Sequence, residues 1–254
     1  IFIMKNVQTP IPALDKAMCI FDYISQNGGS SFTQILNHCR FAKSTTSSLL
    51  NNLVAHGLLR QDDKNYYLGL RLYELGNRAS EQYSIKKIAS PILNHIKDVT
   101  GLTCHLGVLE GMSPIYLLKV DSPQNIIIRS WEGKRLSLHS SGLGKVLIAW
   151  HDESELEVLL PANKKLKKFT DNTITDVDTL KAELYKIRQR GWSYDDEEDS
   201  LGVRCIAVPV FNSHREVVAA ISISGVAFQL PDDKRTNLAN LLVTASSRLT
   251  SLLK

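Results

Sequence analysis

Residues 43–59 read KSTTSSLLNNLVAHGLL, and this stretch decides the fold of the first part of the chain. Its aliphatic residues recur at helical spacing and predict a buried stripe of Leu49, Leu50, Leu53 and Val54. We expect Ser44 to be the N-cap of this helix and Gly57 to end it. A solvated helix usually carries glutamate and lysine opposite its apolar stripe, whereas this one carries Ser44, Ser48, Asn52 and Ala55.

The segments around this helix complete a recognisable motif. Apolar periodicity over residues 11–26 predicts one helix, and Ser31 or Thr33 can cap a short second helix that ends near residue 40. Two short strands are expected at 58–61 and 65–69, on either side of a turn. Helix, helix, turn, helix and hairpin is the order of a winged helix-turn-helix. In that motif the second helix of the pair lies in the major groove of DNA.

The charge distribution also favours a polyanionic partner. The formal net charge is +4, and residues 1–87 hold ten Lys and Arg against six Asp and Glu, whereas residues 23–61 hold no acid at all. Hydroxyl and amide side chains bond both phosphates and base edges. The predicted DNA contacts are Lys43, Ser44, Thr45, Ser47, Ser48, Asn52, Arg60 and Lys64. The alternative is a capped, solvated surface helix, and the acids Asp62 and Asp63 of the turn would repel phosphates.

The hydrophobic pattern of the sequence changes after residue 70. Helical spacing over 70–96 predicts a connecting helix and then the first helix of a second domain, with Pro91 as a break or a helix start. Strands are expected at 103–109, 115–120, 125–130, 205–211 and 217–224, and helices at 142–150, 152–160, 176–190 and 232–253. Strands in blocks with flanking helices predict an α+β fold with a mainly antiparallel sheet. The expected domains are a winged helix-turn-helix at 8–70, a linker helix at 71–88 and a ligand-binding domain at 89–254.

Several other classes of protein are disfavoured. No apolar run approaches the length of a membrane span, so we expect no membrane partner. The four cysteines are scattered and favour reduced thiols in a cytoplasm. The segment SSGLGK at 140–145 lacks the spacing of a phosphate-binding loop, and no hydrolase or zinc-protease motif occurs. Cys104, His105, His139, Asp195 and Cys205 match no standard zinc spacing, so we predict no metal and no cofactor.

Three stretches carry a family resemblance. They are KSTTSSLLNNLVAHGLL with YYLGLRLYELG (66–76), LHSSGLGKVLIAW (138–150), and GWSYDDEEDSLGVRCIAVPVF (191–211) with AAISISG (219–225). Together they resemble the IclR family of bacterial transcription regulators. The resemblance implies a winged helix-turn-helix joined by a helix to a GAF-like effector domain, in a homodimer or homotetramer. It also implies a small organic-acid or sugar-acid effector, and the second and third blocks are most similar to members that control sugar-acid catabolism.

The resemblance also assigns residues. Lys43, Ser44 and Thr45 match the Lys-Ser-Thr of the family, whereas Ser47 and Ser48 replace its aromatic or His and its Arg, so the operator preference of relatives does not transfer. The implied effector site consists of Gly142, Leu143, Asp195, Val203, Cys205, Ser222 and Ser224.

The chemistry of these residues fits an anionic, hydroxylated ligand. Gly142 and Gly144 would let backbone N–H groups at a helix start face an anion. Ser222 and Ser224 lie two apart on a strand and so share a face, and Asp195 would accept from ligand hydroxyls. The alternatives are outward-facing serines, a Cys205 that only fills the core, and a solvated acidic loop at 195–199.

Two functions therefore compete. One is a ligand-responsive, sequence-specific DNA-binding regulator, expected to be a repressor of a catabolic operon that binds double-stranded operator DNA. The other is a small-molecule-binding enzyme or sensor domain with an accessory helical domain. The acid-free stretch at 23–61 favours the regulator, because an enzyme has no reason to exclude carboxylates there.

Overall fold

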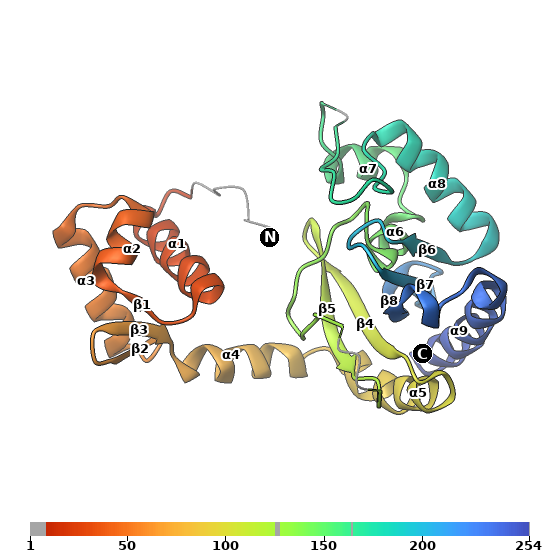
Figure 1. Ribbon diagram of the computed structural model, residues 1–254, viewed down its shortest axis with the longest axis horizontal. Coiled ribbons are helices and arrows are strands. Elements are labelled where there is room, and N and C mark those ends of the chain that lie inside the picture. Colours follow the sequence, from red (N-terminus) through yellow and green to blue (C-terminus); the bar gives the residue numbers. More distant parts are fainter. Residues whose placement is uncertain (1–8, 125–127, 164, 254) are drawn as a thin grey trace. The chain divides into compact units, whose positions relative to one another are not determined.

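The computed structural model describes residues 9–124, 128–163 and 165–253. The chain divides into two compact units, Ile1–Gln82 and Tyr83–Lys254 (Figure 1). Each unit has its own hydrophobic core, so each is described by itself.

The first unit is a helix-turn-helix with a three-stranded wing. Its elements are α1 (Pro12–Asn27), β1 (Ser30–Ser31), α2 (Phe32–Cys39), α3 (Lys43–Ala55), β2 (Leu59–Asp62), β3 (Asn65–Leu68) and α4 (Leu70–Glu81). The antiparallel sheet has the order β1-β3-β2. Ile20 and Ile24 of α1, Ile35 of α2 and Leu50 of α3 meet in its core. The predicted order of helices and hairpin is therefore confirmed, whereas β1, only two residues long, was not foreseen.

Of the two N-caps predicted for this unit, one is present and the other is not. Ser31 is the N-cap of α2, and with Gln34 it forms a capping box in which each side chain bonds the other residue's backbone N–H. The predicted N-cap Ser44 is wrong. Helix α3 begins at Lys43 after Ala42, which offers no side-chain cap, because the turn from α2 leads directly into the helix. Ser44 is thereby free to face solvent.

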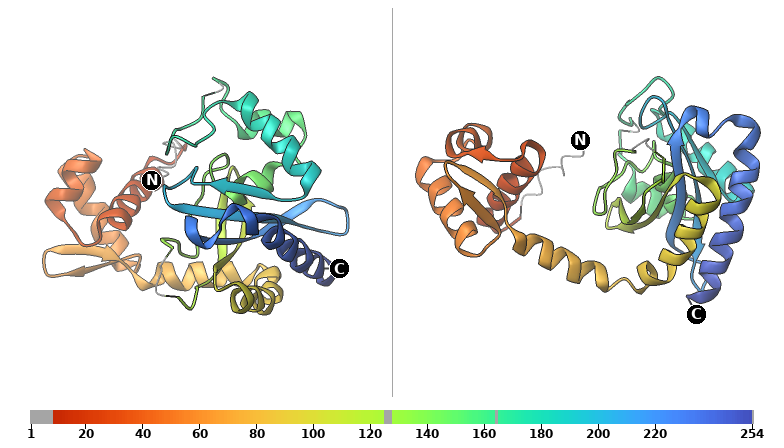
Figure 2. Two further views of the ribbon diagram at one scale, coloured as in Figure 1. Left: turned by 45° about the vertical axis from the view of Figure 1, so that its right-hand side comes forward. Right: turned by 60° about the horizontal axis from the view of Figure 1, so that its bottom comes forward.

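The second unit is an α+β sandwich of helices around one antiparallel sheet. Its elements are α5 (Ser84–Thr100), β4 (Thr103–Glu110), β5 (Ser113–Val120), α6 (Gly142–Ile148), α7 (Glu153–Leu159), α8 (Val177–Arg190), β6 (Ser193–Asp196), β7 (Val203–Phe211), β8 (Val217–Val226), the short 3-10 helix η1 (Ala227–Gln229) and α9 (Asp232–Leu252). The strand order is β5-β4-β8-β7-β6. Helices α5 and α9 pack on one face, and α6, α7 and α8 cover the other (Figures 1 and 2).

Strand alternation explains why both faces are covered. Along β7, Ile206 and Val208 enter the core under α5 and α9, whereas Ala207 enters the core under α6 and α8. Each face therefore has an apolar layer that needs a helical cover, and the α+β prediction is confirmed.

Two details of the second unit correct the sequence interpretation. Pro91 does not break a helix but lies inside α5, because the apolar face of α5 packs on the sheet continuously on both sides of it. The helical break lies at residues 82–83, between α4 and α5. The predicted strand at 125–130 is also wrong where it can be judged. Residues 125–127 lie outside the described residues, and 128–130 form no strand.

Candidate functional site

The exposed face of α3 consists of the polar residues that the sequence singles out. Lys43, Ser44, Ser47, Ser48 and Asn52 are exposed, and Thr45 is half-buried. Thr46 is fully buried, and its hydroxyl donates to the Ala42 carbonyl at 3.2 Å. Asn51 was missed, although it follows Ser47 by four residues and is exposed on the same face. A row of neutral donors and acceptors therefore lies along α3 without an acid among them.

The wing offers weaker candidates for contact with a polyanion. The Arg60 guanidinium lies 4.2 Å from the centre of the Tyr67 ring and forms a 3.6 Å ion pair with Asp62. Asp63 turns the chain with a positive φ of 53°, and Lys64 beside it is exposed. Arg60 is thus partly neutralised within the wing, whereas Lys64 projects from its tip.

The predicted effector residues of the strands form one polar row across the sheet. In register, Asp195 of β6 lies beside Cys205 of β7, which lies beside Ser224 of β8. The next row of the same face brings Ser222 beside His105 of β4. Asp195, Cys205, Ser222 and Ser224 are all buried under α6. The structure thus assembles residues that lie far apart in the chain.

The other predicted residues border this row. Leu143 of α6 is buried and contacts Gly107 of β4, where an added Cβ would come within 3.2 Å of it. Val203 is half-buried at the start of β7 and pairs with Val226. Both lie at the margin of the polar row and contribute apolar surface to it.

The glycines of α6 serve close packing, and the N–H group of Gly144 is already bonded within the chain. The Gly144 N–H donates to the Ser141 hydroxyl at 3.0 Å, so the expectation that it faces an anion is wrong. A Cβ on Gly142 would lie 3.1 Å from the Cys205 sulfur. A Cβ on Gly144 would lie 2.1 Å from the Ser137 carbonyl oxygen. Only glycine lets α6 approach the sheet and its own preceding turn this closely.

Asp195 is held as a neutral acid at the end of the row on the edge strand β6. Its Oδ1 accepts the backbone N–H of Glu198 at 2.7 Å. Burial raises the pKa of Asp195 to about 8, against the opposing effect of the Lys145 ammonium. At neutral pH the carboxyl therefore mostly keeps its proton and can donate as well as accept, whereas the sequence predicted an acceptor only.

The acidic run at 195–199 is not a solvated loop throughout. Glu198 is buried and forms an ion pair with Lys145, whose ammonium also donates to the Tyr194 carbonyl at 2.6 Å. Burial raises the pKa of Glu198, and Lys145 opposes this rise. Asp199 accepts from the Ser140 hydroxyl at 2.8 Å. The Lys145 ammonium is therefore already bonded to Glu198 and to the Tyr194 carbonyl, so α6 offers no free cation to the row.

Two neighbours of the row, His105 and Tyr116, were missed by the sequence interpretation. Their rings stack with centroids 4.2 Å apart, and His105 Nε2 lies 2.9 Å from the Ser130 hydroxyl. Burial lowers the pKa of His105 to about 3, so the imidazole is neutral. Alternation along β4 places His105 on one face with Thr103 and Gly107, but only the register with β8 shows that this is the face of Ser222.

Hydrogen bonding among the buried polar groups of this region is incomplete. Among the described residues, no group bonds His105 Nδ1, and Ser222 Oγ has no partner other than the Cys205 thiol, although both side chains are fully buried. The Cys205 sulfur faces the hydroxyls of Ser222 and Ser224, and burial raises the pKa of its thiol to about 12. Buried polar groups are normally satisfied by a partner, water or ligand. The polar row therefore has spare hydrogen-bonding capacity and no net charge.

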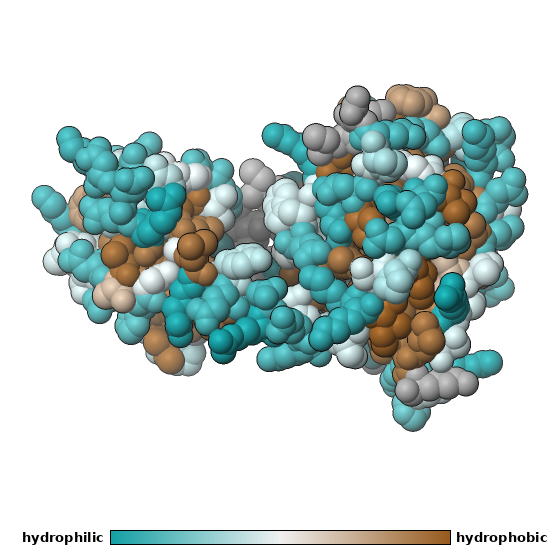
Figure 3. Space-filling view, turned by 90° about the horizontal axis from the view of Figure 1, so that it is seen from below, coloured by the Kyte–Doolittle hydropathy of each residue, from teal (hydrophilic) through white to brown (hydrophobic). Residues whose placement is uncertain are grey.

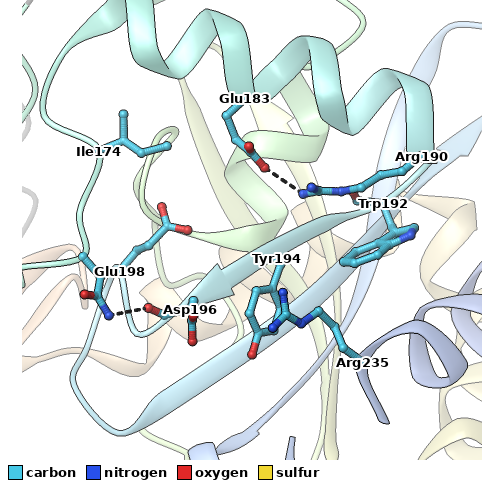
Figure 4. A pocket seen from close by; sticks show the side chains of 9 residues that line it. Ile174, Glu183, Arg190, Trp192, Tyr194, Asp196, Glu198 and Arg235 are labelled. Atoms are coloured by element: carbon cyan, nitrogen blue, oxygen red, sulfur yellow. Dashed lines mark hydrogen bonds and ion pairs between the residues drawn. The ribbon is translucent and has the colours of Figure 1, made fainter. Parts of the chain in front are cut away.

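A separate cavity of about 440 Å³ lies beside the edge strand β6, where Glu183 of α8 and Arg235 of α9 line it (Figure 4). The Arg190 guanidinium lies 4.5 Å from the Trp192 ring centre and pairs with Glu183 at 2.7 Å. The Arg235 guanidinium lies 4.1 Å from the Tyr194 ring centre. No predicted effector residue lines this cavity. The described part of the chain holds no cluster of three His, Cys, Asp or Glu that could bind a metal ion. It also holds no helix long and apolar enough to cross a bilayer.

The comparisons with known families and structures cover nearly the whole chain. The family described as IclR helix-turn-helix domain matches residues 13–63. The family described as Bacterial transcriptional regulator IclR C-terminal matches residues 77–251. Among solved structures, IclR of Thermotoga maritima is similar with a TM-score of 0.76 at 34% identity, over 95% of this chain and 98% of that one.

Two curated relatives are similar over their whole length. The Uncharacterized HTH-type transcriptional regulator RhmR of Escherichia coli (strain K12) is 38% identical over 244 residues, which cover 96% of this chain and 94% of RhmR. The HTH-type transcriptional regulator XynR of the same strain is 34% identical over 246 residues, which cover 96% of this chain and 97% of XynR. With both of its units matched, the chain belongs to the IclR family of bacterial transcriptional regulators.

Proposed function

We propose that this chain is a ligand-responsive repressor of a catabolic operon. It binds double-stranded operator DNA in the cytoplasm through α3 and responds to a small organic acid or sugar acid bound between α6 and the sheet. The observation that carries the proposal is the group of buried polar side chains on one face of the sheet, from Asp195 on β6 to His105 on β4, in which His105 Nδ1 has spare hydrogen-bonding capacity. Repression is the commoner mode in the family that the chain resembles.

The DNA-binding part rests on the exposed face of α3. Its hydroxyl and amide groups suit phosphates and base edges alike, and Lys43 at the helix start adds a positive charge. Of the wing residues, Lys64 suits a phosphate better than Arg60, which Asp62 already neutralises in part.

A matched pair of substitutions tests this interface. Asn52→Asp on α3 and Asn94→Asp on α5 make the same isosteric change at two exposed positions, where each amide donates to the carbonyl four residues earlier. With a duplex selected from a random-sequence library, Asn52→Asp should weaken binding by about 1–3 kcal/mol, and Asn94→Asp should leave it unchanged. Equal affinities of the two variants, measured by fluorescence anisotropy, would place the DNA surface elsewhere.

The charge state of the groups in and around the row indicates the class of ligand. Asp195, His105 and Cys205 are uncharged, and Lys145 is occupied by Glu198. A ligand therefore meets neutral donors and acceptors, which suit the hydroxyls of a sugar acid, and its carboxylate would accept from serine hydroxyls and the protonated Asp195.

Thermal-shift screening tests the ligand class. Sugar acids, 2-keto acids and aromatic acids are the probes, since a compound that binds only the folded state raises the melting temperature. Asp195→Ala should abolish the shift, because it removes both the donor and the acceptor of the protonated carboxyl. Asp196→Ala is the control, since Asp196 is the next residue of β6 and pairs with Arg204 at 2.8 Å. A shift that survives in Asp195→Ala would remove this carboxyl from the site.

The assembly is proposed to be a homodimer or a homotetramer. Helix α4 buries none of its residues within the chain and exposes Leu70, Tyr73 and Leu75. Figure 3 shows apolar surface on both units among mostly hydrophilic side chains. A dimer would present two α3 helices to half-sites about one helical turn apart. Sedimentation velocity should show a species larger than the monomer, and Tyr73→Glu should reduce it.

A further inference from the structure

Two cysteines of the first unit lie in direct contact. The sulfur of Cys19 in α1 lies 3.2 Å from the sulfur of Cys39 at the end of α2, and both residues are free thiols. They are twenty residues apart in the sequence, and neither lies on α3. A disulfide has an S–S distance of about 2.05 Å, so closing one requires the sulfurs to approach by about 1 Å.

We infer that Cys19 and Cys39 are a redox-active dithiol, at which a hydroperoxide closes a disulfide that ties α1 to the turn before the recognition helix. Cys19 is half-buried and is the more accessible of the pair, whereas Cys39 is 9% exposed. Cys19 is therefore the sulfur that meets the oxidant, and Cys39 resolves the product.

The oxidation of the two thiols proceeds in two steps. The Cys19 thiolate attacks the terminal oxygen of the hydroperoxide, breaks its O–O bond, becomes a sulfenic acid and releases an alcohol or water after protonation. The Cys39 sulfur then attacks the Cys19 sulfur, and its proton leaves with the sulfenic hydroxyl as water. The two sulfurs together lose two electrons, which reduce the hydroperoxide. A dithiol such as dithiothreitol reverses the reaction.

The other cysteines serve as internal controls for selectivity. Cys104 and Cys205 are buried in the second unit, and burial raises the pKa of each thiol to about 12. Both therefore contain almost no thiolate near neutral pH and are shielded from solvent. Burial and the neighbouring Cys19 also raise the pKa of Cys39 to about 12, which suits a resolving residue that does not react with the oxidant first.

The position of Cys39 gives the disulfide a route to DNA binding. Arg40, the next residue, has a positive φ of 54° and turns the chain out of α2, and α3 begins three residues later at Lys43. A pull on Cys39 towards α1 shifts the start of this turn and hence the recognition helix. We therefore expect the disulfide to weaken operator binding, a consequence that rests on the proposed function.

Thiol chemistry tests the site without any DNA. The reduced full-length chain is treated with hydrogen peroxide, and its thiols are counted after denaturation. Two of the four thiols should be lost, the mass should fall by two hydrogen atoms, and peptide mapping should find Cys19 joined to Cys39. Cys39→Ser should stop at a Cys19 sulfenic acid that dimedone traps, whereas Cys104→Ala should still form the disulfide. Four surviving thiols, or disulfides between chains only, would overturn the inference.

A second measurement tests the consequence for DNA. The duplex selected with the reduced protein should lose affinity after peroxide treatment and regain it with dithiothreitol, whereas the affinity of Cys39→Ser should change little. Unchanged affinity of fully disulfide-bonded protein would overturn the switch. A chain that closes the disulfide but selects no duplex in its reduced form would instead contradict the proposed function.

Discussion

Replacement of Asp195 by Asn should make the second unit more stable at neutral pH and change it little in mild acid. Asp195 is 5% exposed, and burial raises its pKa from 3.8 to about 8. The folded protein therefore retains a proton that the unfolded chain releases. Stability from this group is complete below about pH 4 and is lost as the pH rises towards about 8.

The size of the effect follows from the pKa change. Each pKa unit corresponds to about 1.4 kcal/mol, so the whole rise corresponds to about 6 kcal/mol, of which about 3 kcal/mol falls between about pH 5 and pH 7.5. Asn cannot ionise, and its amide oxygen can still accept the Glu198 N–H. The variant's excess in free energy of unfolding over the wild type should therefore be about 3 kcal/mol larger at about pH 7.5 than at about pH 5.

Tryptophan fluorescence isolates the unit in which the change is made. Trp131, Trp150 and Trp192 are the three tryptophans of the chain, and all follow Tyr83, so urea unfolding followed by fluorescence reports the second unit. The comparison of variant with wild type at each pH cancels the titration of every other group. A stability difference that is the same at both pH values would refute a neutral Asp195.

Four other substitutions have defined outcomes. Lys145→Met should destabilise the second unit by about 3–5 kcal/mol in urea unfolding, because it leaves Glu198 buried without its cation; a loss below about 1 kcal/mol would contradict the buried pair. Gly144→Ala should cost about 1–3 kcal/mol or more by steric overlap, whereas Gly76→Ala on α4, with nothing within 4 Å, should stabilise by about 0.5–1 kcal/mol in thermal melts followed by circular dichroism. Ser31→Ala should destabilise the first unit by about 1 kcal/mol in the same melts through loss of the capping box, and an unchanged midpoint would argue against that cap.

Local patterns in the sequence were sufficient for most elements of both units. The spacing of Leu50 and Leu53 predicts which side of α3 is buried, because a helix repeats every 3.6 residues whatever surrounds it. The predictions failed where packing overrides local preference. Pro91 is accommodated because the rest of α5 buries a continuous apolar face. Ser44 does not cap α3 because the incoming turn sets the helix start.

Part of the candidate ligand site could likewise be predicted from the sequence, and part could not. Alternation along one strand places Ser222 and Ser224 on one face, and the family resemblance adds Asp195 and Cys205 to them. Neither shows that His105 of β4 completes the row, since strand order and register depend on contacts between segments more than 100 residues apart in the chain.

The sequence by itself therefore determined the acid-free exposed face of α3, which depends on local periodicity and composition, and the family, through the resemblance of three stretches. Only the tertiary structure decided the protonation of Asp195, the burial of the Lys145–Glu198 pair and the contact between Cys19 and Cys39. Desolvation and sulfur–sulfur contact arise from the groups that folding brings around a side chain, and the order of residues along the chain does not specify them.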